Sequence, residues 1–127
     1  MTDPAPTASR LRPCPRRPNC VSTQADPEDP KHMDPIPYQG TLAQARERLL
    51  AILRGYPRTR VVQDDGDYLH AECRSKVFRF VDDVEFQFDD TAKHIRFRSA
   101  ARLGYRDFGV NRNRMEEITR LFTGRDA

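Results

Sequence analysis

The stretch KVFRFVDDVEFQFD, residues 76–89, decides the fold of this 127-residue chain. Apolar side chains recur in it at alternate positions, which is the period of a β-strand and not that of a helix. The alternation predicts a strand with one row of side chains in a core and the other row toward solvent. The inward row consists of Phe78, Phe80, Val84, Phe86 and Phe88.

Asp82 falls in the middle of that apolar row. Its neighbour Asp83 points to the opposite face, because consecutive residues of a strand alternate in direction. The two carboxylates therefore cannot form a close pair for general acid–base catalysis unless a bulge intervenes. We expect both to be structural, with Asp82 binding an arginine or capping backbone amides at a bulge or bend.

Three more strands are predicted around this one. TRVVQ at 59–63 and YLHAECR at 68–74 flank the turn residues DDGD, which is typical of a hairpin. HIRFRS at 94–99 follows a second polar turn and directs Ile95 and Phe97 inward. Together the four strands predict an antiparallel meander.

A helix is predicted before the meander, over residues 42–54. Thr41 and Gln44 have the spacing of a capping box, and apolar residues follow at helical intervals. Gly55 and Pro57 end the pattern in the expected order, because glycine tolerates the left-handed conformation and proline cannot continue a helix.

A second helix is predicted after the meander, with Asn111 as its N-cap and an apolar stripe from Met115 to Phe122. Gly124 lies just beyond its end. We therefore expect an α+β fold: a four-stranded antiparallel meander flanked by an N-terminal and a C-terminal helix, both packed on one face.

The chain has enough bulky apolar material for one small core. Seven phenylalanines and four tyrosines offset a hydrophobic content of only 37%, and the length is that of a single domain. Nine of the ten prolines lie within the first 40 residues, where regular structure cannot propagate far. We expect a flexible tail over 1–13, an extended proline-rich arm docked on the domain over 14–40, and the α+β core domain over 41–124.

Charge is segregated along the chain although its net value is only +3. Residues 60–92 carry nine acidic and four basic side chains, and residues 93–127 carry nine basic and four acidic ones. This predicts ion pairs between the two segments inside the fold. It also argues against nucleic-acid binding, because the acidic segment would share the sheet with the arginines and repel phosphates.

Four motifs follow one another along the chain: CPRRPNCVSTQ at 14–24, DPIPY at 34–38 after His32, FVDDVEFQFD at 80–89, and RSAARLGYRDFGVNRNRMEEI at 98–118. Together and in this order they resemble a bacterial and plastid family labelled domain of unknown function 1499. The resemblance implies no established activity. It also implies that many relatives carry a signal peptide, lipoprotein anchor or membrane segment, whereas this sequence has neither an apolar leader nor a run of about 18 apolar residues. We expect a soluble, cytoplasmic protein.

The stretch RSAARLGYRDFGVNRNR, residues 98–114, contains five arginines and the predicted start of the second helix. Guanidinium groups bind carboxylate or phosphate in a bidentate manner, and a helix N-terminus adds positive potential. The stretch therefore predicts an anion site on the polar strand face. The expected ligand-binding residues are Arg98, Ser99, Arg102, Tyr105, Asp107, Asn111, Arg112, Ser75 and His32. The other interpretation is that the arginines pair with the protein's own carboxylates, Asp82, Asp83, Glu85 and Asp107.

The cysteines and histidines show no pattern of a metal or nucleophile site. Three cysteines are an odd number, and the spacing of Cys14 and Cys20 fits no compact zinc motif, although a structural disulfide between them is possible. We expect no metal and no cofactor. The leading hypothesis is a non-enzymatic binding or accessory module for an anionic small molecule or an acidic protein segment. The alternative is an enzyme of unassigned reaction that uses the same site, with His32, Ser75 or Cys20 as its reactive group.

Overall fold

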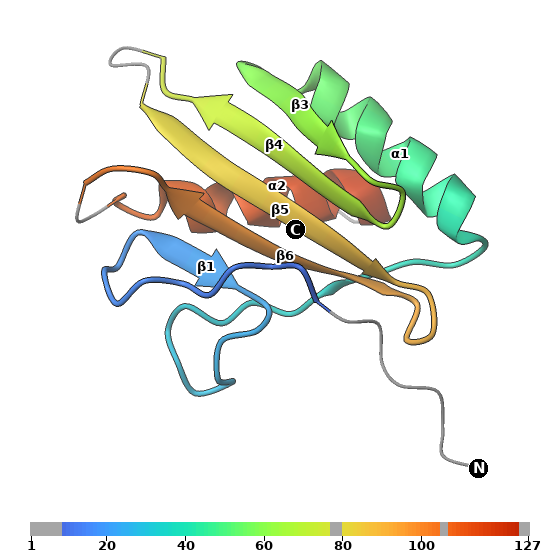
Figure 1. The fold of residues 1–127 in the computed structure, drawn as a ribbon, viewed down its shortest axis with the longest axis horizontal. Helices are drawn as coiled ribbons and strands as arrows, with labels where there is room; N and C mark the ends of the chain where they lie inside the picture. The colour runs from blue at the N-terminus through green and yellow to red at the C-terminus, as the bar shows by residue number, and fades with distance from the viewer. Residues whose placement is uncertain (1–8, 77–79, 105–106, 125–127) are drawn as a thin grey trace.

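The computed structural model describes residues 9–76, 80–104 and 107–124. In chain order the elements are β1 (Cys20–Ser22), β2 (Ile36–Pro37), α1 (Leu42–Gly55), β3 (Thr59–Asp64), β4 (Tyr68–Arg74), β5 (Val81–Asp89), β6 (His94–Ala101) and α2 (Val110–Thr123). The strands form one antiparallel sheet in the order β1-β6-β5-β4-β3 (Figure 1). The short strand β2 also pairs with β6. The predicted α+β class with an antiparallel sheet and two helices is confirmed.

Within the described residues the sheet has six strands and not the four that were predicted. The two additional strands come from the proline-rich arm, where Val21 pairs with Ser99 and Ile36 pairs with Ile95. Both are short because prolines interrupt the arm and cannot donate to a ladder. They cover the edge of β6 that would otherwise present unpaired backbone groups.

The predicted start of α1 is confirmed. The Thr41 side chain accepts a hydrogen bond from the backbone N–H of Gln44 at 3.1 Å, and the Gln44 side chain accepts one from the backbone N–H of Thr41 at 3.0 Å. This reciprocal pair satisfies two of the N–H groups that a helix start leaves without partners.

The predicted N-cap of α2 was wrong. The N-cap is Gly109, in the left-handed conformation at φ 80°, and Asn111 lies inside the helix and is fully buried. Asp107 takes over the capping role, because its carboxylate accepts from the backbone N–H groups of Gly109 at 3.0 Å and Asn111 at 3.1 Å. The predicted end is confirmed, with Gly124 as a left-handed C-cap.

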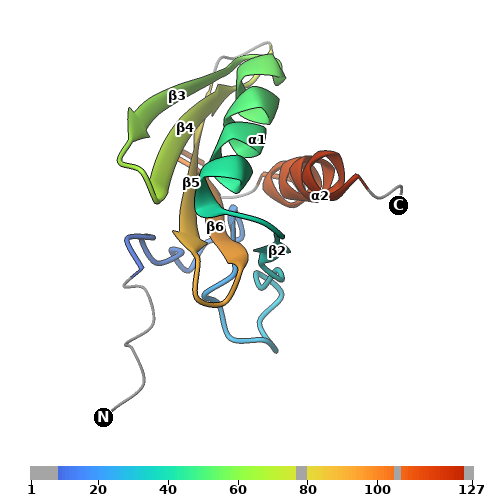
Figure 2. The same cartoon turned by 90° about the vertical axis from the view of Figure 1, so that its right-hand side faces the viewer.

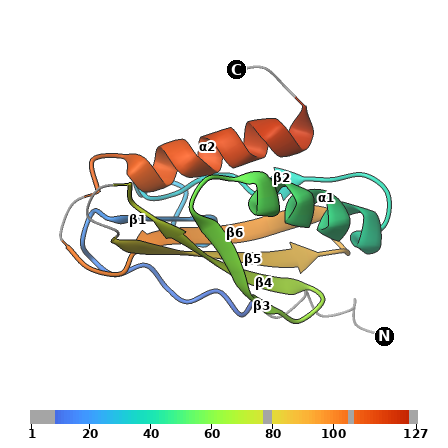
Figure 3. The ribbon, with the colours of Figure 1, turned by 90° about the horizontal axis from the view of Figure 1, so that it is seen from above.

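Both helices pack on one face of the sheet, and the core lies between them and the strands (Figures 2 and 3). Phe86, Phe88 and Phe97 are buried there, as their alternation predicts. The prediction was wrong for Phe80, which is 57% exposed, because β5 begins only at Val81 and Phe80 precedes it in the β4–β5 connection. Phe78 lies outside the described residues.

The chain before β1 crosses the opposite face of the sheet (Figures 2 and 3). We call this the arm-side face. Leu11 is buried, and the backbone N–H of Arg10 donates to the Gln87 side chain at 3.2 Å, so the docked arm includes Arg10 to Pro13 in addition to the predicted residues 14–40. Strand alternation gives the arm-side face the side chains of Tyr68, His70, Glu72, Arg74, Asp83, Glu85, Gln87, Asp89, His94, Arg96 and Arg98.

Candidate functional site

The side chains of β6 alternate between the two faces of the sheet, so the residues of the predicted anion site do not lie together. Arg98 lies on the arm-side face, whereas Ser99, the next residue, points into the helix-covered face and is fully buried. Consecutive strand residues cannot line one cleft, so these two belong to different clusters.

On the arm-side face, Arg98 binds a carboxylate of the protein itself. Its Nη1 lies 3.1 Å from Oε1 of Glu85, and the two residues are 8% and 1% exposed. Tyr68 donates its hydroxyl proton to Oε2 of Glu85 at 2.5 Å. Burial and this bond to a carboxylate raise the pKa of Tyr68 above its ordinary value. Arg98 is therefore already paired with an internal carboxylate.

Arg102, just after β6, is also occupied by internal carboxylates. Its Nε and Nη2 donate to both oxygens of Asp83, at 3.0 and 2.7 Å, and Nη2 also reaches Glu72 at 3.0 Å. His70 Nε2 lies 2.8 Å from Asp83. Burial acts to raise the pKa of Asp83, but the bonds to Arg102 and His70 outweigh it and hold this pKa below its ordinary value.

On the helix-covered face, a buried polar cluster joins β5, β6 and α2. Ser99 donates to the side-chain oxygen of Asn111 at 2.6 Å, and Arg114 donates to the same oxygen at 2.9 Å. Nη2 of Arg114 then binds Oδ2 of Asp82 at 2.8 Å. This ion pair is the reason that an aspartate stands in the phenylalanine row. The pairing of β5 with β4 and β6 continues without a shift through Asp82 and Asp83.

Arg112 and His32 hold the arm against the start of α2. Nη2 of Arg112 donates to the backbone carbonyls of Pro30 at 2.5 Å and His32 at 3.2 Å. The His32 ring bonds to the carbonyl of Ala25 at 2.9 Å. Both residues therefore serve contacts of the arm.

Ser75 lies in the β4–β5 connection, where its hydroxyl accepts from the backbone N–H of Phe80 at 2.9 Å. Among the described residues, no hydrogen bond or ion pair joins Ser75 to the arginines of the arm-side face. The predicted Tyr105 lies outside the described ranges. The described members of the expected ligand-binding set are thus spread over both faces of the sheet and three connections, β1–β2, β4–β5 and β6–α2.

Cys14 and Cys20 are joined by a disulfide, which closes a short ring of the arm beside β1. Cys20 therefore has no free thiol, and Cys73 is the free cysteine. Within the described ranges, no group of three or more histidine, cysteine, aspartate or glutamate residues could hold a metal ion. Neither helix in the described part of the chain has the length and apolar character needed to span a membrane.

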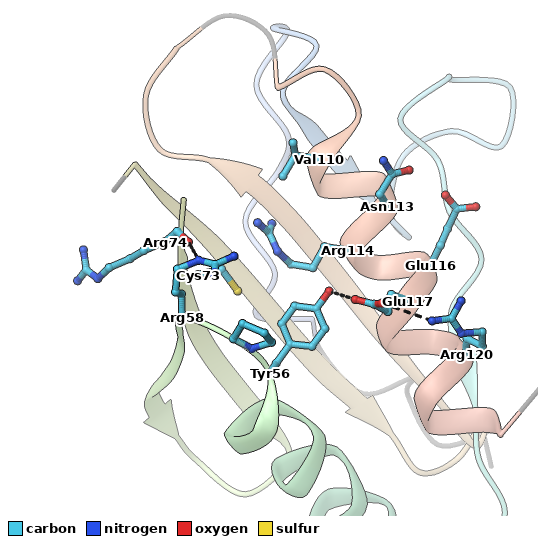
Figure 4. Close-up of a pocket in the computed structure, with 11 residues that line it drawn as sticks. Tyr56, Arg58, Cys73, Arg74, Val110, Asn113, Arg114, Glu116, Glu117 and Arg120 are labelled. Atoms are coloured by element: carbon cyan, nitrogen blue, oxygen red, sulfur yellow. Dashed lines mark hydrogen bonds and ion pairs between the residues drawn. The ribbon is translucent and has the colours of Figure 1, made fainter. Parts of the chain in front are cut away.

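A pocket of about 560 Å³ opens between the end of α1, the β3–β4 hairpin and α2 (Figure 4). Tyr56, Pro57 and Val110 supply apolar surface, and Arg58 and Arg114 supply charge. The volume is within the range of small-molecule sites. The pocket uses the end of the arginine-rich stretch, but its other walls come from residues that the sequence did not single out.

The guanidinium groups of Arg58 and Arg114 extend into this space from opposite walls, whereas the Arg74 side chain extends away from it (Figure 4). Arg58 makes no ion pair with any described carboxylate, and its Nε donates to the carbonyl of Arg74 at 3.1 Å. Its backbone is left-handed, at φ 52°. A side chain other than glycine, asparagine or aspartate rarely takes this conformation, and such strained residues concentrate at functional sites.

Apart from the Glu116 carboxylate on α2, which makes no ion pair with any described residue, the other polar groups of the pocket are neutral or internally bonded. Burial raises the pKa of the Cys73 thiol, whose sulfur lies 3.2 Å from Thr59 Oγ1. Burial, with a hydrogen bond to Glu117, raises the pKa of Tyr56 to about 12. At neutral pH both groups stay protonated and uncharged, so neither offsets the positive charge of Arg58. Sequence patterns offered no signal for this site, because Arg58 appears only as the residue after a helix-ending proline.

A family model described as "Protein of unknown function (DUF1499)" matches residues 10–122 of the chain. The match includes the arm contacts at Arg10, the whole sheet and nearly all of α2, so the resemblance seen in the four motifs is confirmed. No curated protein and no solved structure matches the chain.

Proposed function

Since the chain belongs to the DUF1499 family, whose description assigns no activity, we propose from its geometry that it is a binding module for a small anionic molecule. The site is the pocket between Arg58 and Arg114. The observation that carries the proposal is the Arg58 guanidinium, which faces the pocket without a described carboxylate partner. Arg114, on the opposite wall, is already paired with Asp82, so an anion in the pocket would give Arg58 a counter-charge as well.

Arg98 and Arg102 are among the expected ligand-binding residues, but they contribute less to an anion site than Arg58. Each is paired with an internal carboxylate at hydrogen-bond distance. A guest would have to displace that carboxylate and leave it unpaired, which costs several kcal/mol. Arg58 involves no such displacement, so the proposed position of the site shifts from the arm-side face to the pocket.

The ligand that fits is a carboxylate or phosphate on a compact, partly apolar body. The charged end would lie between the two guanidinium groups, where hydrogen bonds to charged groups contribute about 1.5 to 3 kcal/mol each. The body would contact Tyr56 and Val110. We expect dissociation constants on the order of 0.1 to 1 mM for a simple anion, which corresponds to about 4 to 5.5 kcal/mol.

The geometry supports the enzyme alternative less well. Cys20 is oxidised to a disulfide, the His32 ring bonds to a backbone carbonyl, and the Ser75 hydroxyl accepts from a backbone N–H. Nucleophilic catalysis needs a nucleophile within hydrogen-bond reach of a base, and these three side chains make no such pair with one another in the described structure.

The disulfide also bears on the predicted cytoplasmic location, which stays a prediction. Stable disulfides form and persist in oxidising compartments and are rare in the cytosol. The Cys14–Cys20 bond therefore favours a location outside a reducing cytosol.

Calorimetric titration with inorganic phosphate and with phenyl phosphate tests the proposal. We expect both to bind the wild-type protein, with phenyl phosphate tighter, and Arg58→Gln to weaken both at least about tenfold through the lost charged hydrogen bond. Arg54→Gln is the matched control, because Arg54 is exposed at the end of α1 and lies outside the pocket lining. Equal affinity of wild type and Arg58→Gln, or no binding to either, would overturn the proposal.

A further inference from the structure

The arm contacts the arm-side face through an arginine pair. The Arg10 guanidinium lies over the Tyr68 ring, 4.3 Å from its centroid, and its Nη2 binds Asp65 at 2.8 Å. Two residues later, Nε of Arg12 binds Oε1 of the buried Glu85 at 3.2 Å. An aromatic face beside a carboxylate is a favourable environment for a guanidinium group.

The groups that receive these arginines are positioned by the sheet and not by the arm. Glu85 is held by Tyr68 and by Arg98, and it is 1% exposed. The Gln87 side chain, which accepts from the arm backbone, donates to the carbonyl of Asp67 at 3.0 Å. The site therefore keeps its shape when the arm leaves, which reduces the ordering cost of binding another segment.

The arm itself is bound as a peptide ligand would be. Residues 10–12 add no strand to the sheet in the described structure, and their backbone makes one hydrogen bond to it, from Arg10 to Gln87. The side chains of Arg10 and Arg12 are 46% and 55% exposed, so the contacts consist of the two guanidinium groups and the buried Leu11.

We propose that the arm-side face is a second binding site, separate from the anion pocket. It recognises a peptide segment in which two arginines are separated by a single residue. In this structure the chain's own Arg10–Arg12 segment occupies the site as an intramolecular ligand. An arginine-bearing segment of a partner competes with it for Tyr68, Asp65 and Glu85.

The test uses the full chain with the double substitution Arg10→Ala and Arg12→Ala, which vacates the site. The probe is the labelled peptide acetyl-Ser-Arg-Leu-Arg-Pro-amide, followed by fluorescence anisotropy. We expect the double variant to bind it at least tenfold more tightly than the wild type, because the tethered arm competes at a millimolar effective concentration. A peptide with lysine in place of both arginines should bind the double variant at least fivefold more weakly, because an ammonium group lacks the planar fork.

Two further variants in the double-variant background locate the binding. Asp65→Asn should weaken the peptide at least threefold, whereas Asp26→Asn, an exposed aspartate in the arm loop, should leave it unchanged. Circular dichroism checks that each variant is folded, and Arg10→Ala alone replaces the double variant should that one unfold. A folded variant that does not bind the peptide, or that binds the arginine and lysine peptides equally, overturns the proposal. So does a wild-type dimer whose stability depends on Arg10 and Arg12, because the occupant is then the arm of a second copy.

Discussion

Substituting Asp82 by asparagine should weaken the fold and strengthen anion binding at once. Asp82 and Arg114 are 2.8 Å apart, and their side chains are 13% and 11% exposed, so water screens the pair little. Breaking a buried pair by removing one partner costs about 3 to 5 kcal/mol. Asparagine keeps one acceptor oxygen for Arg114, and a neutral hydrogen bond contributes about 1 kcal/mol. The expected loss of unfolding free energy is therefore about 2 to 4 kcal/mol.

The same change leaves Arg114 without its counter-charge beside the anion pocket. A phosphate between Arg58 and Arg114 would then face a net charge more positive by one unit, and we expect its affinity to rise about tenfold, equivalent to about 1.4 kcal/mol. Bound phosphate should also return part of the lost stability, because a ligand that binds only the folded state stabilises it by mass action.

Urea unfolding followed by circular dichroism, with and without phosphate, measures both effects. Asp90→Asn is the matched control, because it removes an exposed carboxylate that is paired with Lys93 outside the pocket. A loss of less than about 1 kcal/mol would place the pair among the weak ion pairs of protein surfaces and refute the stability reasoning. A normal loss of stability with unchanged phosphate affinity would refute the placement of the anion beside Arg114.

Three other outcomes follow from the structure. Burial and the bond to Glu85 raise the pKa of Tyr68, so its neutral hydroxyl contributes to the free energy of unfolding fully below pH 10, and this contribution is lost as pH rises through the folded-state pKa. Urea midpoints between pH 9 and 11.5 should therefore fall more steeply in the wild type than in Tyr68→Phe. Replacing Cys14 and Cys20 by serine should speed hydrogen exchange in the arm while amides of β5 stay protected, and equal protection of the arm would show that the disulfide does not hold it. Thr41→Ala should cost about 1 kcal/mol in urea unfolding through the lost capping box, and no change would mean that the helix start is stabilised by packing alone.

The meander and the first helix could be predicted because their signals are local. The alternation through Phe86 and Phe88 and the capping box of Thr41 each lie within a few residues of sequence. The helix start near Asn111 was misplaced by two residues, because asparagine and aspartate offer similar caps and only the coordinates show that Asp107 accepts the N–H bonds.

The arm strands and the pocket could not be predicted, because they depend on distant contacts. A three-residue strand such as Cys20–Ser22 is too short to show alternation, and it is stabilised by the edge of β6. Arg58 and Arg114 are 56 positions apart in the sequence and line one pocket only because α2 packs on β6 and beside α1. The internal pairing of acidic and basic segments was foreseen, but strand direction decided which arginine met which carboxylate.

The two-sided character of β6 has a practical consequence for mutational scanning. Neighbouring residues of this strand face opposite sides of the sheet, so substitutions at consecutive positions disturb different sites. Arg98 contacts the proposed peptide site on the arm-side face, whereas Ser99 belongs to the polar cluster beside the anion pocket. A residue-by-residue scan of this strand should therefore yield two interleaved phenotypes, and averaging over neighbouring positions would erase both.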